Sequence, residues 1–392
     1  MSGGTPLLRV GMVGYGFMGA AHSQGWRVAP RFFDLPAQPS MNVLVGRHSD
    51  RVEAAAAKWG WSETATDWRT LLDRDDIDII DIVTPGDSHA EIAIAALEAG
   101  KHVMCEKPMS NTVAEAVAMT AAAEAAAKKG VLAMVGYTYR RVPAASFARE
   151  LVAAGKIGQV QQVRASYLQD WLVDPTVPRS WRLQKELAGS GALGDIGAHA
   201  IDLAQFVTGL TLTSVSGILE TIIKERPLEG ERTGITGTAG EGMGAVTVDD
   251  MALFTGRFDN GALGSFEATR FSTGRKNALR LEVSGSLGAI SFDLEDLNSL
   301  GFYDSTAPAT EQGFTKIYVT EPQHPYVSAW WPAGHMLGYE HGFSHQAKDF
   351  VEAIASGQQP TPSFADALQV QRVLAAVEAS AGNGSAWTST TK

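Results

Sequence analysis

The sequence is poor in cysteine and lacks a long hydrophobic run, and both shortages narrow the kind of protein that it encodes. Cys105 is the single cysteine among 392 residues, which excludes an internal disulfide and any metal site built on several thiolates. No run of 18 apolar residues occurs, so we expect no membrane span and no membrane partner. The apolar stretch Leu7–Phe17 is interrupted by Arg9 and by glycines, unlike a signal peptide. We therefore expect a cytoplasmic protein.

Positive charge is also scarce. The chain carries 32 Lys and Arg against 43 Asp and Glu, a formal net charge of −11. Because no local basic stripe offsets this charge, we expect no nucleic-acid partner. Hydrophobic residues make up 45% and charged residues 19%, which is typical of a folded globular protein, and the length favours two domains.

Strands and helices alternate along the first third of the chain, which predicts a doubly wound parallel sheet. The predicted strands are 8–13, 41–45, 76–84, 102–105 and 131–137, and the predicted helices are 20–27, 51–59, 88–99 and 112–129. The proline-bearing stretch 28–40 is predicted to be a loop. We place this α/β domain at residues 1–140.

After residue 140 the pattern changes to consecutive strands joined by tight turns, such as Asp259-Asn260-Gly261, and this predicts an antiparallel sheet. Strands are predicted at 160–168, 215–224, 251–258, 262–269, 279–285 and 288–293, and helices at 144–154, 191–208, 339–356 and 364–380. The glycine-rich stretch 229–245 is predicted to be a mobile loop. We therefore expect residues 141–392 to form an α+β domain with a large, open, mainly antiparallel sheet, and we expect this domain to serve substrate binding and oligomerisation.

A glycine motif lies between the first predicted strand and helix. Gly14, Gly16 and Gly19 fit G-x-G-x-x-G, in which the first glycine permits a tight turn, the second admits a pyrophosphate and the third allows close packing. With Phe17 and Met18 they are candidate cofactor-binding residues of a Rossmann domain. The alternative is a plain glycine-rich turn.

The end of the second predicted strand normally supplies an acid that binds the cofactor ribose. Here the strand ends Val45-Gly46-Arg47, and the acid is missing. Arg47 would pair with a 2′-phosphate, so we expect NAD or NADP, with Arg47 favouring NADP. The alternative for Arg47 is a solvated surface arginine.

Two further segments carry candidate chemistry. Glu106 and Lys107 follow a parallel strand, at the edge of the sheet where ligands bind, and the lysine is placed to reach a nicotinamide ribose and a substrate hydroxyl. Asp195 and His199 are four residues apart on a predicted helix and share a face. A carboxylate beside an imidazole suits a base that takes a proton from an alcohol, whereas the alternative is a surface pair.

Together these features resemble the glucose-fructose oxidoreductase, inositol dehydrogenase and rhizopine-catabolism family, Gfo/Idh/MocA, over essentially the whole chain. The resemblance rests on the opening glycine motif, Thr84-Pro85 with His89, Glu106-Lys107-Pro108, Trp181-Arg182 and residues 191–202. It implies that His199 is the acid/base, that Lys107 holds the reacting hydroxyl and the cofactor, and that Asp195 supports them. It also assigns cofactor contacts to Thr84, Pro85, His89, Glu106 and Lys107. The chain departs from the family at Gly86, where asparagine is frequent.

Within the family, the segments around 167–171 and 180–195 resemble the branch of levoglucosan-dehydrogenase-like sugar 3-dehydrogenases. That likeness implies substrate contacts at Tyr139, Gln169, Trp181, Arg182 and Tyr339, besides Asp195 and His199. These residue types suit a sugar, which needs polar groups for its hydroxyls and an aromatic surface for its C–H face. No metal site is expected, because no carboxylate or cysteine pattern accompanies the histidines at 335, 341 and 345.

The resemblance implies an NAD(P)-dependent oxidoreductase that oxidises a secondary hydroxyl of a sugar, anhydrosugar or polyol to a ketone by hydride transfer. Two alternatives stay open, namely a glycosidase that uses bound NAD for transient oxidation and a non-catalytic sugar or cofactor sensor. Retention of Lys107, Asp195 and His199 argues against the sensor. An open sheet face needs covering, so we also expect a homodimer or homotetramer.

Overall fold

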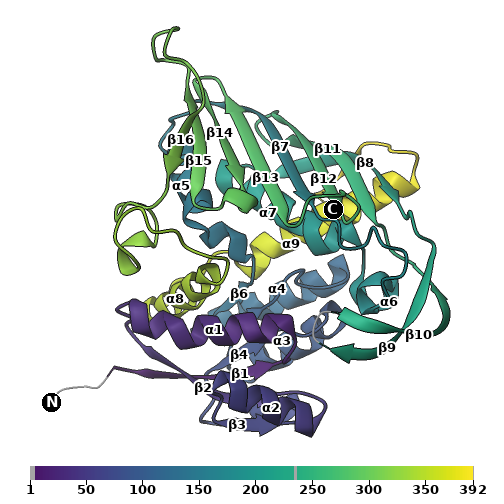
Figure 1. The fold of residues 1–392 in the computed structure, drawn as a ribbon. Coiled ribbons are helices and arrows are strands. Elements are labelled where there is room, and N and C mark those ends of the chain that lie inside the picture. The colour runs from purple at the N-terminus through teal and green to yellow at the C-terminus, as the bar shows by residue number, and fades with distance from the viewer. Residues whose placement is uncertain (1–4, 234–235, 392) are drawn as a thin grey trace. The chain divides into compact units, whose positions relative to one another are not determined.

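The computed structural model describes residues 5–233 and 236–391, which divide into two compact units (Figure 1). The first unit contains the described residues up to Thr138 together with Gly338–Leu368, and the second contains Tyr139–Leu337 and the chain from Gln369 onward. No helix within the described residues is long and apolar enough to cross a membrane.

The continuous boundary that we predicted after residue 140 therefore differs from the structure in one segment. Residues 338–368 belong to the first unit because α8 (His341–Ser356) packs along α1 (Phe17–Phe32). The two helices approach so closely that a Cβ atom at Gly25 would lie 2.6 Å from the carbonyl oxygen of Phe343. This contact joins residues more than 300 positions apart, and no local sequence pattern reports it.

The first unit is built on a six-stranded parallel sheet with the strand order β3-β2-β1-β4-β5-β6, which confirms the expected doubly wound fold. Its strands are β1 (Leu7–Val13), β2 (Gln38–Val45), β3 (Glu63–Ala65), β4 (Ile79–Ile82), β5 (His102–Cys105) and β6 (Ala133–Val135). Its other helices are α2 (Ser49–Trp59), α3 (His89–Glu98) and α4 (Val113–Ala127), and α9 (Phe364–Gly382) begins in this unit. Ile79, Ile80 and Ile82 are fully buried, as expected of a parallel strand covered on both faces.

Helix α1 is longer than predicted. It continues to Phe32 and contains Pro30, whereas we expected a loop from residue 28. Proline lacks the N–H that a helix interior requires, but this one lies in the last turns, and the buried face formed by Trp26 and Ala29 continues past Arg27. Burial of that apolar face outweighs one missing backbone bond.

The second unit is built on a nine-stranded sheet with the order β16-β15-β14-β13-β7-β12-β11-β8-β17. All neighbours are antiparallel except β7 and β12, which confirms the expected mainly antiparallel sheet. Its strands are β7 (Val160–Leu168), β8 (Leu212–Glu220), β11 (Met251–Phe258), β12 (Leu263–Thr269), β13 (Ala278–Gly285), β14 (Gly288–Asp293), β15 (Ser299–Asp304), β16 (Thr315–Tyr318) and β17 (Thr388–Ser389).

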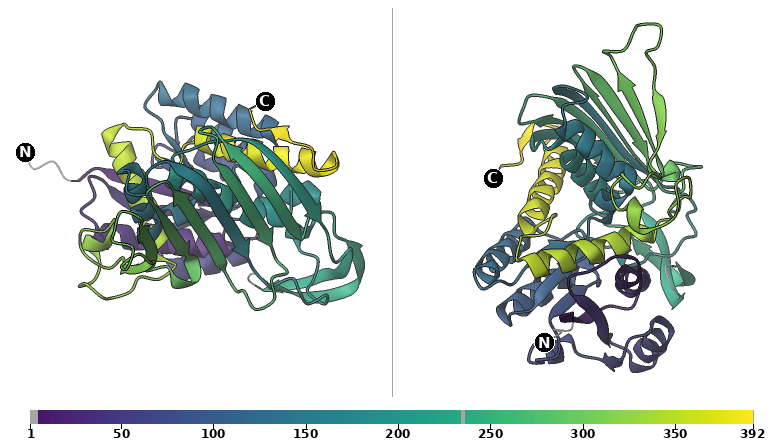
Figure 2. Two further views of the ribbon diagram at one scale, coloured as in Figure 1. Left: turned by 90° about the horizontal axis from the view of Figure 1, so that it is seen from above. Right: turned by 90° about the vertical axis from the view of Figure 1, so that its left-hand side faces the viewer.

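Helices cover one face of this sheet and leave the other face open (Figure 2). Helix α7 (Ala198–Thr208) packs on β7, β12 and β13, and α5 (Pro143–Ala153) packs on β14 and β15. Along β11 the residues alternate between buried and exposed, as a strand with one covered face requires. Between β7 and α7 lie the short helix α6 (Lys185–Ala188) and a π-helical turn, Leu193–Gly197.

The stretch 229–245, predicted to be a mobile loop, instead contributes to a two-stranded antiparallel hairpin of β9 (Glu225–Thr233) and β10 (Thr236–Ala245). Residues 234 and 235 lie outside the described part of the chain. A Cβ atom at Gly240 would lie 3.2 Å from the backbone nitrogen of Gly230. Here the glycines allow two strands to approach each other closely. A glycine-rich composition is equally compatible with a flexible loop, so composition alone does not predict the hairpin.

Candidate active site

The loop Gly14–Gly19 follows β1 and is closely packed wherever it faces protein. Gly14 has a φ of +116°, and a Cβ atom there would lie 2.8 Å from the carbonyl oxygen of Val83. A Cβ atom at Gly19 would lie 2.7 Å from the carbonyl oxygen of Gly14, whereas one at Gly16 would meet nothing within 4 Å. The first and third glycines thus close the turn, and the second borders open space.

This geometry fits the pyrophosphate of a dinucleotide. Helix α1 starts directly after Gly16, which has no side chain to occupy the helix N-terminus, and the first turn contains no acidic residue. The positive end of the helix dipole is therefore presented to an anion. Phe17 is 46% exposed and stacks on Tyr339, with ring centroids 6.4 Å apart, while Met18 is half-buried. Tyr339, predicted as a substrate contact, thus lies beside the glycine loop of its own unit.

Arg47 is exposed in the segment that joins β2 to α2. The preceding Gly46 packs on the glycine loop, because a Cβ atom at this position would overlap the ring of Tyr15. The C-terminal end of β2 therefore adjoins the dinucleotide loop, as the fold requires.

His89 joins the loops that follow β4 and β5. It is buried, and its ring nitrogens lie 2.8 Å from the carbonyl oxygen of Thr84 and 3.0 Å from that of Pro108. Burial lowers the pKa of His89, which favours a neutral ring at pH 7. Pro85, which directly follows Thr84 in the sequence, is half-buried. Because β1, β4 and β5 are parallel neighbours, their following loops meet at one edge of the sheet.

At Gly86, where asparagine is frequent in the family, the neighbouring space is filled by an asparagine from another loop. A Cβ atom at Gly86 would lie 2.6 Å from Oδ1 of Asn111. The amide of Asn111, which comes from the loop after β5, therefore occupies the space next to Gly86.

Glu106 and Lys107 directly follow β5 and differ in their surroundings. The carboxylate of Glu106 is buried, and its Oε1 lies 3.0 Å from Nε2 of His22. Its Oε2 accepts a hydrogen bond of 3.2 Å from the backbone N–H of Lys107. Lys107 itself is half-buried. Glu106 was predicted to contact the cofactor. In the structure its carboxylate contacts His22, a residue that the sequence analysis did not single out.

In the second unit, Asp195 lies in the π-helical turn and His199 lies in the first turn of α7, where we predicted one continuous α-helix. Oδ2 of Asp195 accepts a hydrogen bond of 2.8 Å from Nη2 of Arg270, and the same nitrogen donates to the carbonyl oxygen of Gly191 at 3.1 Å. Arg270 is fully buried. Sequence reasoning missed Arg270, because it lies 75 positions from Asp195 without a recognisable motif.

His199 is half-buried beside two tyrosine rings. Its ring centroid lies 4.6 Å from that of Tyr139 and 5.9 Å from that of Tyr167. The hydroxyls of Tyr139 and Tyr167 are 2.8 Å apart, and Tyr167 donates to Oδ1 of Asn277 at 2.7 Å. The side-chain amide of Gln169 donates to the same Oδ1 at 2.9 Å. The structure thus brings Tyr139 and Gln169, both predicted as substrate contacts, into one polar group with His199.

Trp181 and Arg182 lie against each other in a short helical turn, Trp181–Leu183, with the guanidinium carbon 4.5 Å from the indole centroid. Lys107 belongs to the first unit, and Asp195 and His199 belong to the second.

Across residues 5–233 and 236–391, no group of three or more His, Cys, Asp or Glu side chains has an arrangement that would hold a metal ion.

Comparison with known proteins places the chain in a family. Residues 8–137 match the model of an oxidoreductase family with an NAD-binding Rossmann fold, and residues 146–291 match the GFO/IDH/MocA C-terminal domain. Levoglucosan dehydrogenase from Pseudarthrobacter phenanthrenivorans is 43% identical over 383 residues, which cover 96% of this chain and 97% of that protein. The NAD(+)-dependent scyllo-inositol 2-dehydrogenase of Bacillus subtilis is 29% identical, covering 70% of this chain and 74% of its own.

Solved structures agree with these matches. An oxidoreductase domain protein from Kribbella flavida is 62% identical with a TM-score of 0.94, covering 99% of this chain and 100% of that one. Levoglucosan dehydrogenase in complex with NADH and levoglucosan is 41% identical with a TM-score of 0.92, covering 98% of this chain and 100% of that one. The comparisons support NAD and give no support to the NADP preference drawn from Arg47. The chain belongs to the GFO/IDH/MocA family of oxidoreductases.

Proposed function

We propose that this protein is an NAD-dependent dehydrogenase that oxidises a secondary hydroxyl of a sugar or anhydrosugar to a ketone. The observation that carries the proposal is the surroundings of His199. A half-buried imidazole lies beside the rings of Tyr139 and Tyr167. The two tyrosine hydroxyls are hydrogen-bonded to each other, and Tyr167 and Gln169 both donate to the side-chain oxygen of Asn277. Such a group combines a base with the aromatic and polar surfaces that sugars require.

Each candidate residue has a distinct role in this proposal. His199 takes the proton from the hydroxyl, and Asp195, held by Arg270, supports the imidazole as its positive charge develops. Lys107 donates a hydrogen bond to the reacting oxygen. A bound NAD⁺ would supply the acceptor for the hydride of the carbinol carbon. The alcohol thereby loses one proton and one hydride and becomes a ketone.

The first unit supplies the cofactor residues of the proposal. Gly14, Gly16 and Gly19 shape the loop that would hold the phosphates, and the backbone N–H groups at Phe17 and Met18, in the first turn of α1, would donate to them. On the nicotinamide side, the proposed contacts are Thr84, Pro85, His89, Glu106 and Lys107. We propose NAD rather than NADP, because the related levoglucosan dehydrogenase has been solved with NADH, and Arg47 then remains a surface residue.

Levoglucosan is the first substrate to examine, because a relative that is 43% identical over 96% of this chain carries that activity in its name. Gln169 and Tyr139 are proposed hydroxyl contacts, joined by Tyr167 and Asn277. Trp181, Arg182 and Tyr339 are further proposed substrate contacts, whose rings and guanidinium suit the faces and hydroxyls of a sugar.

The test is the reduction of NAD⁺ and NADP⁺ across sugars, anhydrosugars, glycosides and inositols. The proposal expects NADH formation with levoglucosan or a related sugar, and a preference for NAD⁺. It also expects that Lys107→Ala removes most turnover while NADH binding stays measurable. A protein that binds sugar and cofactor without reducing the cofactor would instead be a sensor, and the proposal would fail.

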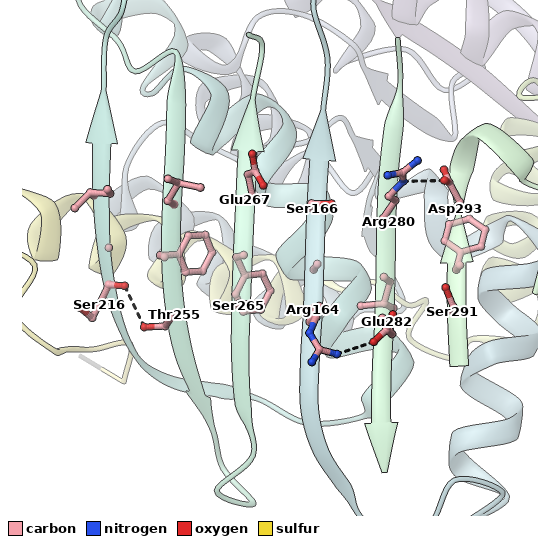
Figure 3. A pocket seen from close by; sticks show the side chains of 18 of the residues that line it. Arg164, Ser166, Ser216, Thr255, Ser265, Glu267, Arg280, Glu282, Ser291 and Asp293 are labelled. Atoms are coloured by element: carbon pink, nitrogen blue, oxygen red, sulfur yellow. Dashed lines mark hydrogen bonds and ion pairs between the residues drawn. The ribbon is translucent and has the colours of Figure 1, made fainter. Parts of the chain in front are cut away.

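We also propose that the protein is a homodimer or homotetramer that covers the open face of its large sheet. This face forms a hollow of about 900 Å³, crossed by the ion pairs Arg164–Glu282 at 2.6 Å and Arg280–Asp293 at 2.8 Å (Figure 3). Beside these pairs, the apolar side chains of Ile218 and Leu253 line the hollow and are 54% and 36% exposed. A second copy would remove them from water.

Light scattering on the purified protein tests this assembly. Leu253→Glu is expected to lower the mass of the particle, whereas Val117→Glu, an exposed apolar position on α4 of the other unit, is expected to leave it unchanged. A monomeric wild type would overturn the assembly.

A cytoplasmic location is also part of the proposal. The single buried Cys105 supports it, and cell fractionation tests it.

A further inference from the structure

A buried histidine in the first unit lies between two carboxylates. Nδ1 of His22, on α1, is 3.0 Å from both oxygens of Asp81 on β4, and Nε2 is 3.0 Å from Oε1 of Glu106. The three side chains are 1%, 0% and 5% exposed. Trp26 also donates from Nε1 to Oδ2 of Asp81 at 2.7 Å. None of these contacts takes part in the chemistry proposed above.

The arrangement favours a positively charged imidazole between two ionised carboxylates. A neutral ring has one N–H, so one carboxylate would face a nitrogen lone pair, whereas the charged ring donates at both ends. Two buried carboxylates without a counter-charge are also strongly unfavourable. Burial by itself lowers the pKa of His22, but Asp81 and Glu106 outweigh burial and raise it to about 10.

Two other buried titratable groups lie near this cluster, and the shift of each pKa favours the neutral form. Burial raises the pKa of the Cys105 thiol well above its usual value, and burial lowers the pKa of His89. From α8, the neighbour of His22 is the uncharged ring of Phe343, with centroids 5.6 Å apart. His22 is therefore a fully buried base placed directly between the two carboxylates.

Glu106 connects the cluster to Lys107. Its Oε2 accepts the backbone N–H of Lys107 at 3.2 Å, and its own backbone N–H donates to the carbonyl oxygen of Ile82 at 2.8 Å. On the remaining side, a Cβ atom at Gly136 would lie 2.6 Å from Oε1. The carboxylate has little freedom to move, so its position fixes the start of the Lys107 turn.

We propose that charged His22 is a positioning residue, which fixes the Glu106 carboxylate and thereby sets the Lys107 turn relative to the glycine loop on the same helix. His22 acts only through Glu106. The proposal rests on the proposed function in one respect, namely that Lys107 acts in catalysis.

The first experiment reads the charge of His22 directly. Nitrogen-15 NMR of histidine-labelled protein is recorded between pH 6 and 10, and the His22 signals are assigned by their loss in His22→Gln. Both ring nitrogens should remain protonated at pH 8.5, where an ordinary imidazole with a pKa of about 6.5 is neutral. Asp81→Asn should lower the pH at which His22 loses its proton. A ring that is neutral at pH 8.5 in the wild type overturns the proposal.

The second experiment reads the position of the Lys107 turn. Hydrogen exchange of the peptide containing Lys107 is compared in wild type, His22→Gln and Thr120→Val, which loses a different buried hydrogen bond, on α4. Protection should fall in His22→Gln alone. With levoglucosan as substrate, kcat should fall on the order of tenfold to a hundredfold in His22→Gln, with NADH affinity and the Thr120→Val kcat nearly unchanged.

The outcomes separate the two proposals. If no sugar is oxidised by the wild type, the proposed function fails, while NMR and hydrogen exchange still test His22. If exchange at Lys107 is the same in His22→Gln and wild type, His22 is a structural residue only and the positioning role is wrong. If His22→Gln does not fold, the His22 signals are identified as those whose titration moves in Asp81→Asn, and a spectrum in which no histidine titration moves contradicts the charge pairing.

Discussion

At the scale of single residues, the account depends on His199. An alcohol must lose a proton as its hydride leaves, and imidazole has an ordinary pKa of about 6.5, close enough to neutral to accept that proton. His199→Asn should lower kcat by about 100-fold or more. The rate of sugar oxidation should rise with pH through one ionisation in the wild type, and this ionisation should disappear in the variant. A near-normal kcat with the same pH profile in His199→Asn would assign the base elsewhere.

Arg270 gives a second prediction at this scale. It is fully buried and donates to Asp195, whose side chain is 30% exposed. Arg270→Met should cost about 1–3 kcal/mol of stability, because Asp195 and Gly191 lose a buried partner. If Arg270 serves catalysis through Asp195, then Arg270→Met and Asp195→Asn should each lower kcat, and the double variant should be no slower than the slower single variant.

Chemical denaturation and steady-state kinetics measure these two effects. Arg9→Met is the matched control, because Arg9 pairs with Asp78 in the first unit and lies outside both the proposed chemistry and the proposed interface. Strictly additive losses of kcat in the double variant would show that Arg270 and Asp195 act independently.

At the scale of elements, the glycine loop separates a structural from a functional requirement. Gly14→Ala forces a side chain into a φ of +116° and against Val83, and it should destabilise the fold by at least about 1–2 kcal/mol. Gly16→Ala meets no protein atom within 4 Å, so the fold should keep its stability. The new methyl group should instead weaken NADH binding, because it faces the proposed pyrophosphate.

Thermal unfolding and NADH fluorescence titration measure this pair of variants together. Equal losses of stability at both positions, or unchanged NADH affinity in Gly16→Ala, would contradict the assignment of the loop.

Element type was predictable from sequence where local pattern decides it. The apolar strand before Gly14 and the alternating strand Met251–Phe258 were predicted because burial on two faces or one face leaves a readable period. The β9–β10 hairpin and the π-helical turn at Asp195 were not. In the hairpin, glycine allows two strands to approach, and in the π-helical turn, Asp195 is held by an arginine from the segment after β12.

At the scale of the whole molecule, the sequence predicted the domain order and many candidate residues but not their partners. Lys107 and His199 stand in motifs with recognisable spacing. His22, Arg270 and Asn277 act through contacts over 59, 75 and 108 residues with Asp81, Asp195 and Gln169, and a single sequence carries no signal for such pairings. For the same reason, the packing of α8 on α1 was visible only in the structure.

The pH dependence of the free energy of unfolding should report the charge of His22. Its pKa in the folded protein is raised to about 10, above the value of about 6.5 in an unfolded chain. Its contribution is therefore complete below pH 6.5 and is lost as the pH rises toward 10. Free energies of unfolding from urea titrations at pH 7 and pH 9.5 should differ more in the wild type than in His22→Gln. Cys105, whose raised pKa acts in the same direction, is common to both proteins and cancels in the comparison, and an equal pH dependence would contradict a charged His22.

Net oxidation of a sugar hydroxyl is tested by the stoichiometry of the reaction. Levoglucosan is incubated with enzyme and excess NAD⁺, and NADH and ketone are each quantified against sugar consumed. One NADH and one ketone are expected for each sugar consumed, and both should be lost in His199→Asn. Sugar cleavage without accumulation of NADH would identify a redox-assisted glycosidase, and binding of cofactor without reduction by any sugar would contradict the account altogether.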